Sequence, residues 1–189
     1  MRFVVTVACV LLLSFLFGCK DKQVDSASAL RFLQGIQSGD KKMMYEAARL
    51  TDNIVNDSRE KLVNPSRYAQ TEQQRKDSEF ALRISGEIDF FSSKFRKMLP
   101  KSAVFIITDS RFKNSTAEAS NAVHLVRISY GNRDEAMTDR TNRPVKEMLL
   151  RLQQVTRSIN GSPMHEFSLN SEDFEKIADK NFEVVSYYQ

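Results

Sequence analysis

The chain has 189 residues and a formal net charge of +4, from 28 Lys and Arg against 24 Asp and Glu. This charge is too small to indicate nucleic-acid binding, and the length suits one domain with a sizeable apolar core. The two cysteines, Cys9 and Cys19, both lie near the N-terminus, which excludes disulfides and thiol catalysis from the rest of the chain.

The N-terminus has the pattern of an export signal. Arg2 precedes a run of mostly apolar residues, 3–18, which ends at Cys19 and is followed by charged residues. A membrane-spanning helix needs about 20 apolar residues, and this run is shorter. Its length is typical of a signal peptide, so we expect residues 1–18 to be removed. An uncleaved anchor is the alternative.

The end of this run carries a more specific motif. Leu16, Phe17, Gly18 and Cys19 resemble the lipobox of bacterial lipoproteins, although Phe17 is larger than the residue usual at its position. The resemblance implies that Cys19 is lipidated and becomes the first residue of the mature chain. Lys20, which follows the cysteine, favours the outer membrane within the cell envelope. Several acyl chains on one protein would hold it almost permanently on a membrane.

Residues 19–28 form a short tether, and a single domain is expected over residues 29–189. Its first helix should end near Gly39, because apolar residues recur at helical spacing, and Asp40 can cap a second helix. The buried positions expected for these two helices are Ala29, Phe32, Leu33, Ile36, Met43, Met44, Ala47 and Leu50. Residues 52–70 are polar and contain the breaker Asn64-Pro65, so they predict a connecting segment with at most a short helix.

The strongest pattern in the domain predicts a long amphipathic helix that Pro100 ends. At about 100° per residue its six apolar residues occupy a single stripe. They are Phe80, Ile84, Ile88, Phe91, Phe95 and Met98.

After Pro100 the pattern changes from helix to strand. Residues 104–108 and 122–130 are rich in β-branched residues, and the charged stretch 131–144 between strands indicates a long loop. Residues 145–159 suit either a helix or a bent strand, and we favour the strand because a helix would leave too few strands for a stable sheet.

The remaining residues are expected to complete the sheet. Asn160-Gly161 favours a hairpin into residues 164–169, a short helix is expected over residues 171–179, and residues 182–188 predict a closing strand. The expected class is α+β, with N-terminal helices packed on a curved antiparallel sheet.

Residues 29–40, a helix that ends in a Gly39-Asp40 turn before a second helix, resemble the opening of NTF2-like lipoproteins. The resemblance implies that the N-terminal helices pack into the hollow of the curved sheet. It also implies a concave pocket between the long helix and the sheet. No position matches a catalytic motif of that family, so no catalytic residue is carried over.

The residues that could carry chemistry do not form a recognisable constellation. His124 and His165 lack the spacing of a metal pair, and we expect one structural and one exposed histidine. The carboxylates of interest are Glu87, Asp89, Asp134, Glu135, Glu172 and Asp173. General acid catalysis needs a buried carboxylate, and all of these except Glu87 are expected to be solvated.

Neither a Gly-x-Ser-x-Gly elbow nor a phosphate-binding glycine loop occurs. We therefore expect a non-enzyme without metal or cofactor: a lipid-anchored envelope protein with a binding or accessory role, whose partner is another envelope protein. A small-ligand binder or cofactor-free enzyme using an NTF2-like pocket is the alternative.

Two surface features leave alternatives open. The basic residues Lys94, Arg96, Lys97 and Lys101 complement the negative end of the long helix, or else contact an anionic membrane or partner. The aromatic end, residues 182–188, is either core or an edge that pairs with a partner strand.

Overall fold

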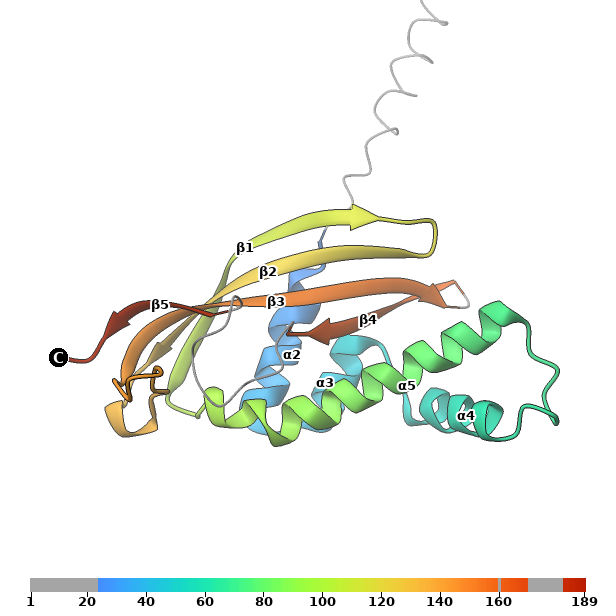
Figure 1. Cartoon of the computed structure of the whole chain (residues 1–189), viewed down its shortest axis with the longest axis horizontal. Coiled ribbons are helices and arrows are strands. Elements are labelled where there is room, and N and C mark those ends of the chain that lie inside the picture. The colour runs from blue at the N-terminus through green and yellow to red at the C-terminus, as the bar shows by residue number, and fades with distance from the viewer. Residues whose placement is uncertain (1–23, 160, 170–181) are drawn as a thin grey trace, which may run out of the picture.

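The computed structural model describes residues 24–159, 161–169 and 182–189. Helices precede strands along the chain, and the helices pack on one antiparallel sheet, which confirms the α+β class (Figure 1). The elements are α2 (Ser26–Ser38), α3 (Lys41–Ala48), α4 (Asp52–Val63), α5 (Glu72–Ser93), the 3-10 turn η1 (Phe95–Met98), β1 (Ala103–Ser115), β2 (Ala119–Tyr130), the 3-10 turn η2 (Arg133–Glu135), β3 (Val145–Ile159), β4 (Ser162–Ser168) and β5 (Phe182–Tyr187). The signal peptide, Cys19 and the helix expected over residues 171–179 lie outside the described residues.

The strand β3 is the centre of the sheet. Strands β1, β2, β3 and β4 follow one another in antiparallel order, and β5 also pairs with β3. One edge of β3 pairs with β2, whereas the other edge is shared between β5 at its start and β4 at its end. Residues 145–159 are therefore a strand, as favoured from the sequence, and the expected hairpin turns at Gly161, whose φ is +78°.

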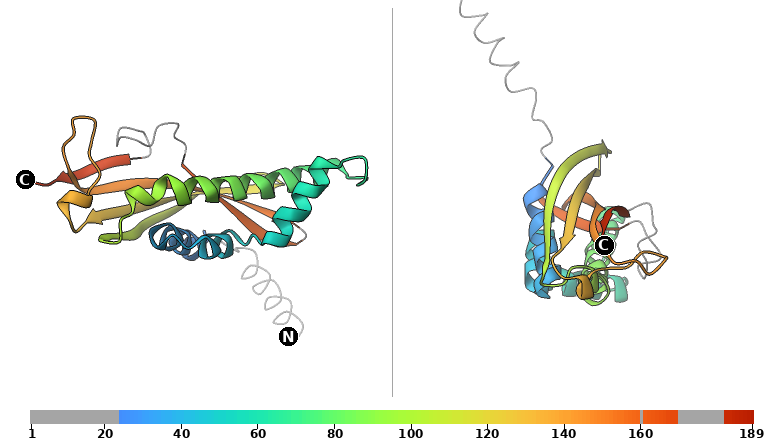
Figure 2. Two further views of the ribbon diagram at one scale, coloured as in Figure 1. Left: turned by 90° about the horizontal axis from the view of Figure 1, so that it is seen from below. Right: turned by 90° about the vertical axis from the view of Figure 1, so that its left-hand side faces the viewer.

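Two register shifts in the pairing of β1 with β2 bend the sheet. They lie between Ile107 and Asp109 and between Phe112 and Asn114. Bulges of this kind increase local twist and curvature. Figure 2 shows the curved strands on one side and α5 running along the length of the sheet on the other.

The first helix ends at Gly39 and the second is capped by Asp40, as predicted, but the first begins at Ser26, within the stretch predicted to be a tether. Asp25 caps α2 by accepting a hydrogen bond from the Ser28 amide, and Asp40 caps α3 by accepting one from the Met43 amide. The chain leaves α2 through Gly39, whose φ of +73° lies in the left-handed region that favours glycine. Of the eight buried positions predicted, only Met43 stays half-exposed.

The prediction for residues 52–70 is wrong, because they contain the 12-residue helix α4. Thr51 caps it, and it ends just before Asn64 and Pro65, as the breaker predicted. Only Val55 and Ser58 are buried within α4. So narrow a buried face leaves almost no apolar periodicity for the sequence to show.

The long helix α5 begins at a capping box formed by Thr71 and Gln74. All six residues of the predicted stripe are buried. The α-helix itself ends earlier than predicted, at Ser93, and the 3-10 turn η1 carries the chain on towards Pro100.

The long loop predicted over residues 131–144 is organised by a carboxylate that the sequence did not single out. Asp139 accepts hydrogen bonds from the Thr141 and Arg143 amides and from the Tyr187 hydroxyl. Burial alone would raise the pKa of this carboxyl, but its hydrogen bonds, that from the Arg143 amide first, lower it to about 2. The loop is thereby fastened to β5, the predicted closing strand.

Candidate functional site

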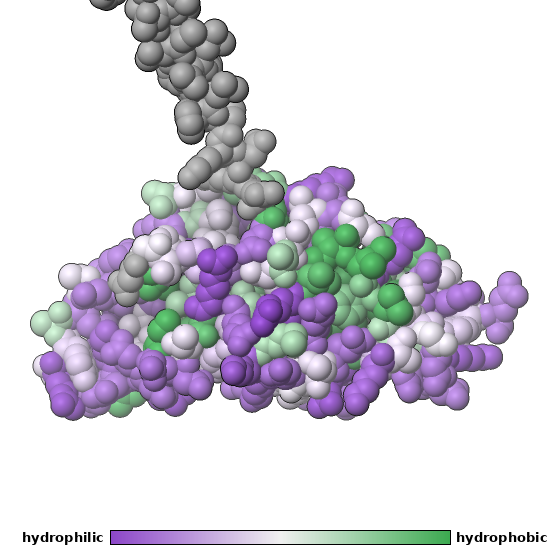
Figure 3. All heavy atoms as spheres, turned by 180° about the vertical axis from the view of Figure 1, so that it is seen from behind, coloured by the Kyte–Doolittle hydropathy of each residue, from purple (hydrophilic) through white to green (hydrophobic). Residues whose placement is uncertain are grey.

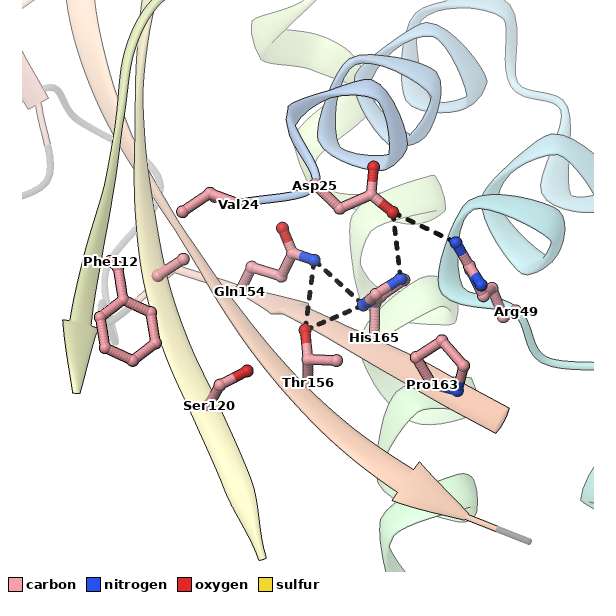
Figure 4. Close-up of a pocket in the computed structure, with 10 residues that line it drawn as sticks. Val24, Asp25, Arg49, Phe112, Ser120, Gln154, Thr156, Pro163 and His165 are labelled. Atoms are coloured by element: carbon pink, nitrogen blue, oxygen red, sulfur yellow. Dashed lines mark hydrogen bonds and ion pairs between the residues drawn. The ribbon is translucent and has the colours of Figure 1, made fainter. Parts of the chain in front are cut away.

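A small pocket opens where the start of α2 and the end of α3 meet the inner face of the sheet (Figure 4). Its volume is about 240 Å³. The lining residues are Val24, Asp25, Arg49, Phe112, Ser120, Ala122, Gln154, Thr156, Pro163 and His165. Along the middle of α5, Phe80, Ile84 and Phe91 are all buried. Nearer the start of α5, a second pocket of about 280 Å³ lies between the long helix and the sheet, lined by Ser78, Ala81 and Met164 among others.

A chain of hydrogen bonds runs across the inner face of the sheet behind this pocket. His124 on β2 lies with Nε2 2.6 Å from Gln154 Oε1 on β3. The Gln154 amide nitrogen is in turn 3.0 Å from Nδ1 of His165 on β4, and the Thr156 hydroxyl is 2.9 Å from the same nitrogen. The Ser110 hydroxyl on β1 lies 2.8 Å from Nδ1 of His124. Four neighbouring strands therefore contribute to one polar network.

The network determines where each histidine carries its proton. The Gln154 oxygen can only accept, so His124 must donate to it from Nε2. The Gln154 amide nitrogen can only donate, so Nδ1 of His165 must be the acceptor. A neutral imidazole has one N–H group, which places the proton of His165 on Nε2. This N–H points away from Gln154, towards Asp25 (Figure 4).

The acceptor nearest to the N–H group of His165 is the Asp25 carboxylate, and among the described residues none meets full hydrogen-bond geometry with it. Nε2 of His165 lies 3.4 Å from Asp25 Oδ2, within ion-pair distance. His165 is only 3% exposed. A buried donor without a well-placed acceptor is uncommon in folded proteins and calls for a ligand or a water.

Asp25 and Arg49 form the mouth of the pocket. Asp25 accepts hydrogen bonds from the amide and hydroxyl of Ser28, and Arg49 Nη2 lies 3.4 Å from its Oδ2. Arg49 ends α3 in the left-handed conformation, with φ +56°, where glycine is the usual residue. The left-handed conformation is unfavourable for an arginine backbone, and from this position the Arg49 side chain reaches Asp25.

At neutral pH the site contains one ion pair, Asp25 with Arg49, and two neutral histidine rings. Burial lowers the pKa of both His124 and His165. Partial burial alone would raise the pKa of the Asp25 carboxyl, but the Ser28 hydrogen bonds, with His165 and Arg49 nearby, lower it below its usual value. At neutral pH Asp25 is therefore ionised beside Arg49.

No family model, curated protein or solved structure matches this chain. The pocket and the sequence motif at Cys19 are therefore the features that bear on function.

The structure corrects the expectation for the histidines. His124 is structural, as expected for one of the two, but the prediction that the other is exposed is wrong because His165 is buried in the same network. Asp25, Arg49 and Gln154 were not predicted as site residues. Gln154 had a signal, since it continues the alternation of the inward-facing Met148, Leu150 and Leu152 by one more step.

Most of the carboxylates considered from the sequence lie outside the pocket. Asp134 and Glu135 are exposed, Asp89 pairs with Lys41, and Glu172 and Asp173 lie outside the described residues. Glu87 is half-buried, and burial first and Glu166 second raise its pKa. Within the described parts of the chain, no group of three His, Cys, Asp or Glu side chains is arranged to hold a metal ion.

A partly buried ion pair that the sequence did not show lies near Glu87, with Glu166 buried and Arg83 exposed. Glu166 on β4 accepts two hydrogen bonds from Arg83 on α5, at 2.6 and 2.8 Å. Bidentate pairs of this kind fix orientation as well as adding energy. The pair joins α5 to β4 and explains why Glu166 can be buried.

Proposed function

We propose that this chain is a lipid-anchored protein of the cell envelope with a non-enzymatic binding role, and that its pocket at Asp25 and His165 takes a small ligand. The observation that carries the proposal is the N–H group of His165, which lacks an acceptor in full hydrogen-bond geometry and which the hydrogen-bond network holds as a donor at the pocket wall. A fixed, buried donor is suited to binding an acceptor on a ligand.

The same geometry argues against acid–base or nucleophilic catalysis. Asp25, His165 and Thr156 follow one another in the order of a catalytic triad, but the Gln154 amide nitrogen, 3.0 Å from Nδ1 of His165, competes with Thr156 for that nitrogen. The Thr156 oxygen also accepts a hydrogen bond from Gln154 at 3.3 Å, which reduces its nucleophilicity. Because its pKa is lowered, the Asp25 carboxylate is also a weak general base on its own.

The position of the pocket supports a membrane-proximal role. Cys19 lies roughly five residues before Val24, and an extended chain of that length spans at most about 18 Å. Because Val24 and Asp25 line the pocket, a lipid on Cys19 would keep the pocket close to the bilayer. Among the described residues, none of the helices has the length and apolar character needed to span a membrane. We further propose the outer membrane as the location and an NTF2-like cone as the finer fold.

The anchor is tested by a cysteine substitution. We expect the Cys19→Ser variant to lose membrane attachment, because residues 20–189 contain no other cysteine thiol for the proposed acyl chains to join. The measurement is the intact mass of protein extracted from membranes, which should equal residues 19–189 plus acyl chains for the unaltered chain. Cys9→Ser is the matched control and should leave that mass unchanged. A mass that retains residues 1–18, or lacks lipid, contradicts the proposal.

A second candidate function is docking of another envelope protein on β1. Within the described part of the sheet β1 pairs with no strand other than β2, and an edge strand of this kind can add a strand from a partner. Val104 and Ile106 on this edge strand are 66% and 54% exposed. A shallow groove beside them is lined by Leu30, Phe105 and Ile107, and Figure 3 shows an apolar patch on this side of the molecule.

The docking function is tested by placing a charge on that strand. We expect Ile106→Lys to abolish cross-linking of a stoichiometric partner in native membranes, because a buried lysine at the interface would lack a counter-charge. Val63→Lys is the control, since Val63 is 70% exposed but lies at the end of α4. If repeated cross-linking of the unaltered chain yields no stoichiometric partner, this function is wrong.

A further inference from the structure

We propose that the Asp25–His165 pocket binds a small, uncharged molecule that carries a carbonyl-type hydrogen-bond acceptor on an apolar body. This inference rests on the proposed binding function and names the class of ligand. It follows from three properties of the pocket: the kind of hydrogen bond that its wall leaves open, the balance of its charges, and its size and lining.

The ligand must supply an acceptor because the open position is a donor. Gln154 and Thr156 occupy Nδ1 of His165, so the ring can offer only the N–H group at Nε2. That group is buried, and its nearest acceptor, Asp25 Oδ2 at 3.4 Å, does not meet hydrogen-bond geometry. A carbonyl oxygen accepts such a hydrogen bond, whereas an ammonium group cannot.

The ligand is uncharged because the charges of the pocket already balance. Asp25 and Arg49 lie 3.4 Å apart at the mouth, and each is the charge nearest to the other there. His165 lies between Asp25 and Gln154 in its neutral form, so it adds no charge (Figure 4). An anion entering the pocket would meet the Asp25 carboxylate, and a cation would meet Arg49. Burying either charge without a partner is unfavourable.

The remaining wall and the volume indicate a small apolar body. Val24, Phe112, Ala122 and Pro163 contribute carbon surface to the lining. A volume of about 240 Å³ corresponds to roughly eight water molecules at about 30 Å³ each. This is below the range of about 300–1,000 Å³ that is usual for drug-sized ligands. Water alone could accept the hydrogen bond from His165, but the apolar lining of the pocket would then stay in contact with water.

The test compares three probes of nearly equal shape: cyclohexanone, cyclohexanecarboxylate and cyclohexylamine. The full-length protein, extracted in detergent and labelled with ¹⁵N-histidine, is titrated with each probe while the Nε2–H signal of His165 is followed by NMR. We expect cyclohexanone to shift this signal and to bind at least about tenfold more tightly than either charged probe.

The Asp25→Asn variant tests the charge balance directly. Asparagine caps helices as well as aspartate does, so α2 should keep its start, while Arg49 becomes an unpaired cation. We expect this variant to gain about tenfold in affinity for cyclohexanecarboxylate. Arg49→Gly, which also suits the left-handed conformation at this position, is the opposite control and should not gain it.

Each outcome decides a different claim. Tighter binding of a charged probe by the unaltered pocket would overturn the ligand class while supporting small-ligand binding there. If none of the three probes shifts the His165 signal, both the ligand class and the binding function of the pocket are wrong. An Asp25→Asn variant that keeps its fold but gains no affinity for the carboxylate would overturn the charge-balance argument.

Discussion

Replacing Phe32 with alanine should lower the free energy of unfolding by about 3–5 kcal/mol. The Phe32 ring on α2 is fully buried between two other rings. It stacks on Phe167 of β4 with centroids 4.5 Å apart and meets the edge of Phe91 of α5 at 5.1 Å. Alanine would leave a cavity among three separate elements, and close-packed side chains can collapse only partly to fill it.

The measurement is denaturant unfolding of the variant beside a control on the same helix. Leu30→Ala removes a side chain that is 36% exposed, and we expect it to change stability by less than about 1 kcal/mol. Because a domain of this size is stabilised by only about 5–15 kcal/mol, the Phe32 variant should be visibly destabilised. Equal losses in the two variants would show that Phe32 is not central to the core.

The elements predicted correctly are those with a wide buried face. The apolar stripe from Phe80 to Met98 predicted helix α5, because a helix that is buried along its length must repeat apolar residues at helical spacing. The ambiguity over residues 145–159 was resolved by counting the strands that a sheet needs. Helix α4 was missed because its contact with the rest of the fold is narrow, and only Val55 and Ser58 are buried in it.

The candidate site could be predicted only in part because it is assembled from distant elements. Met164, His165, Glu166 and Phe167 are all buried, so β4 lacks the alternation that would show which face each side chain occupies. The cause is tertiary: α3 and α5 lie against β4, and Asp25 reaches His165 from the start of α2. No pattern of residue spacing in the sequence predicts that Asp25 and His165 lie together. The Ser and Thr partners of the histidines are likewise set by strand register.

Acidification from pH 7.5 to 5.5 is expected to lower the free energy of unfolding, because the fold requires both histidines to be neutral. Burial lowers the pKa of His124 and His165 in the folded state, whereas in the unfolded chain each titrates near 6.5. The unfolded chain therefore binds more protons between the folded pKa and about 6.5, and stability is lost as the pH falls through 6.5. Each histidine can contribute up to about 1.4 kcal/mol per pH unit within that window.

Denaturant unfolding at a series of pH values measures this loss, and two variants separate its causes. His124→Gln keeps a donor that can reach Gln154 and should remove one histidine's share of the slope. Glu87 acts in the opposite direction, since burial raises its pKa, and acidification through that raised pKa favours the folded state, so Glu87→Gln should steepen the loss wherever that carboxyl titrates. A stability that stays constant from pH 7.5 to 5.5 in the Glu87→Gln variant would mean that the buried histidines accept protons as readily as in the unfolded state.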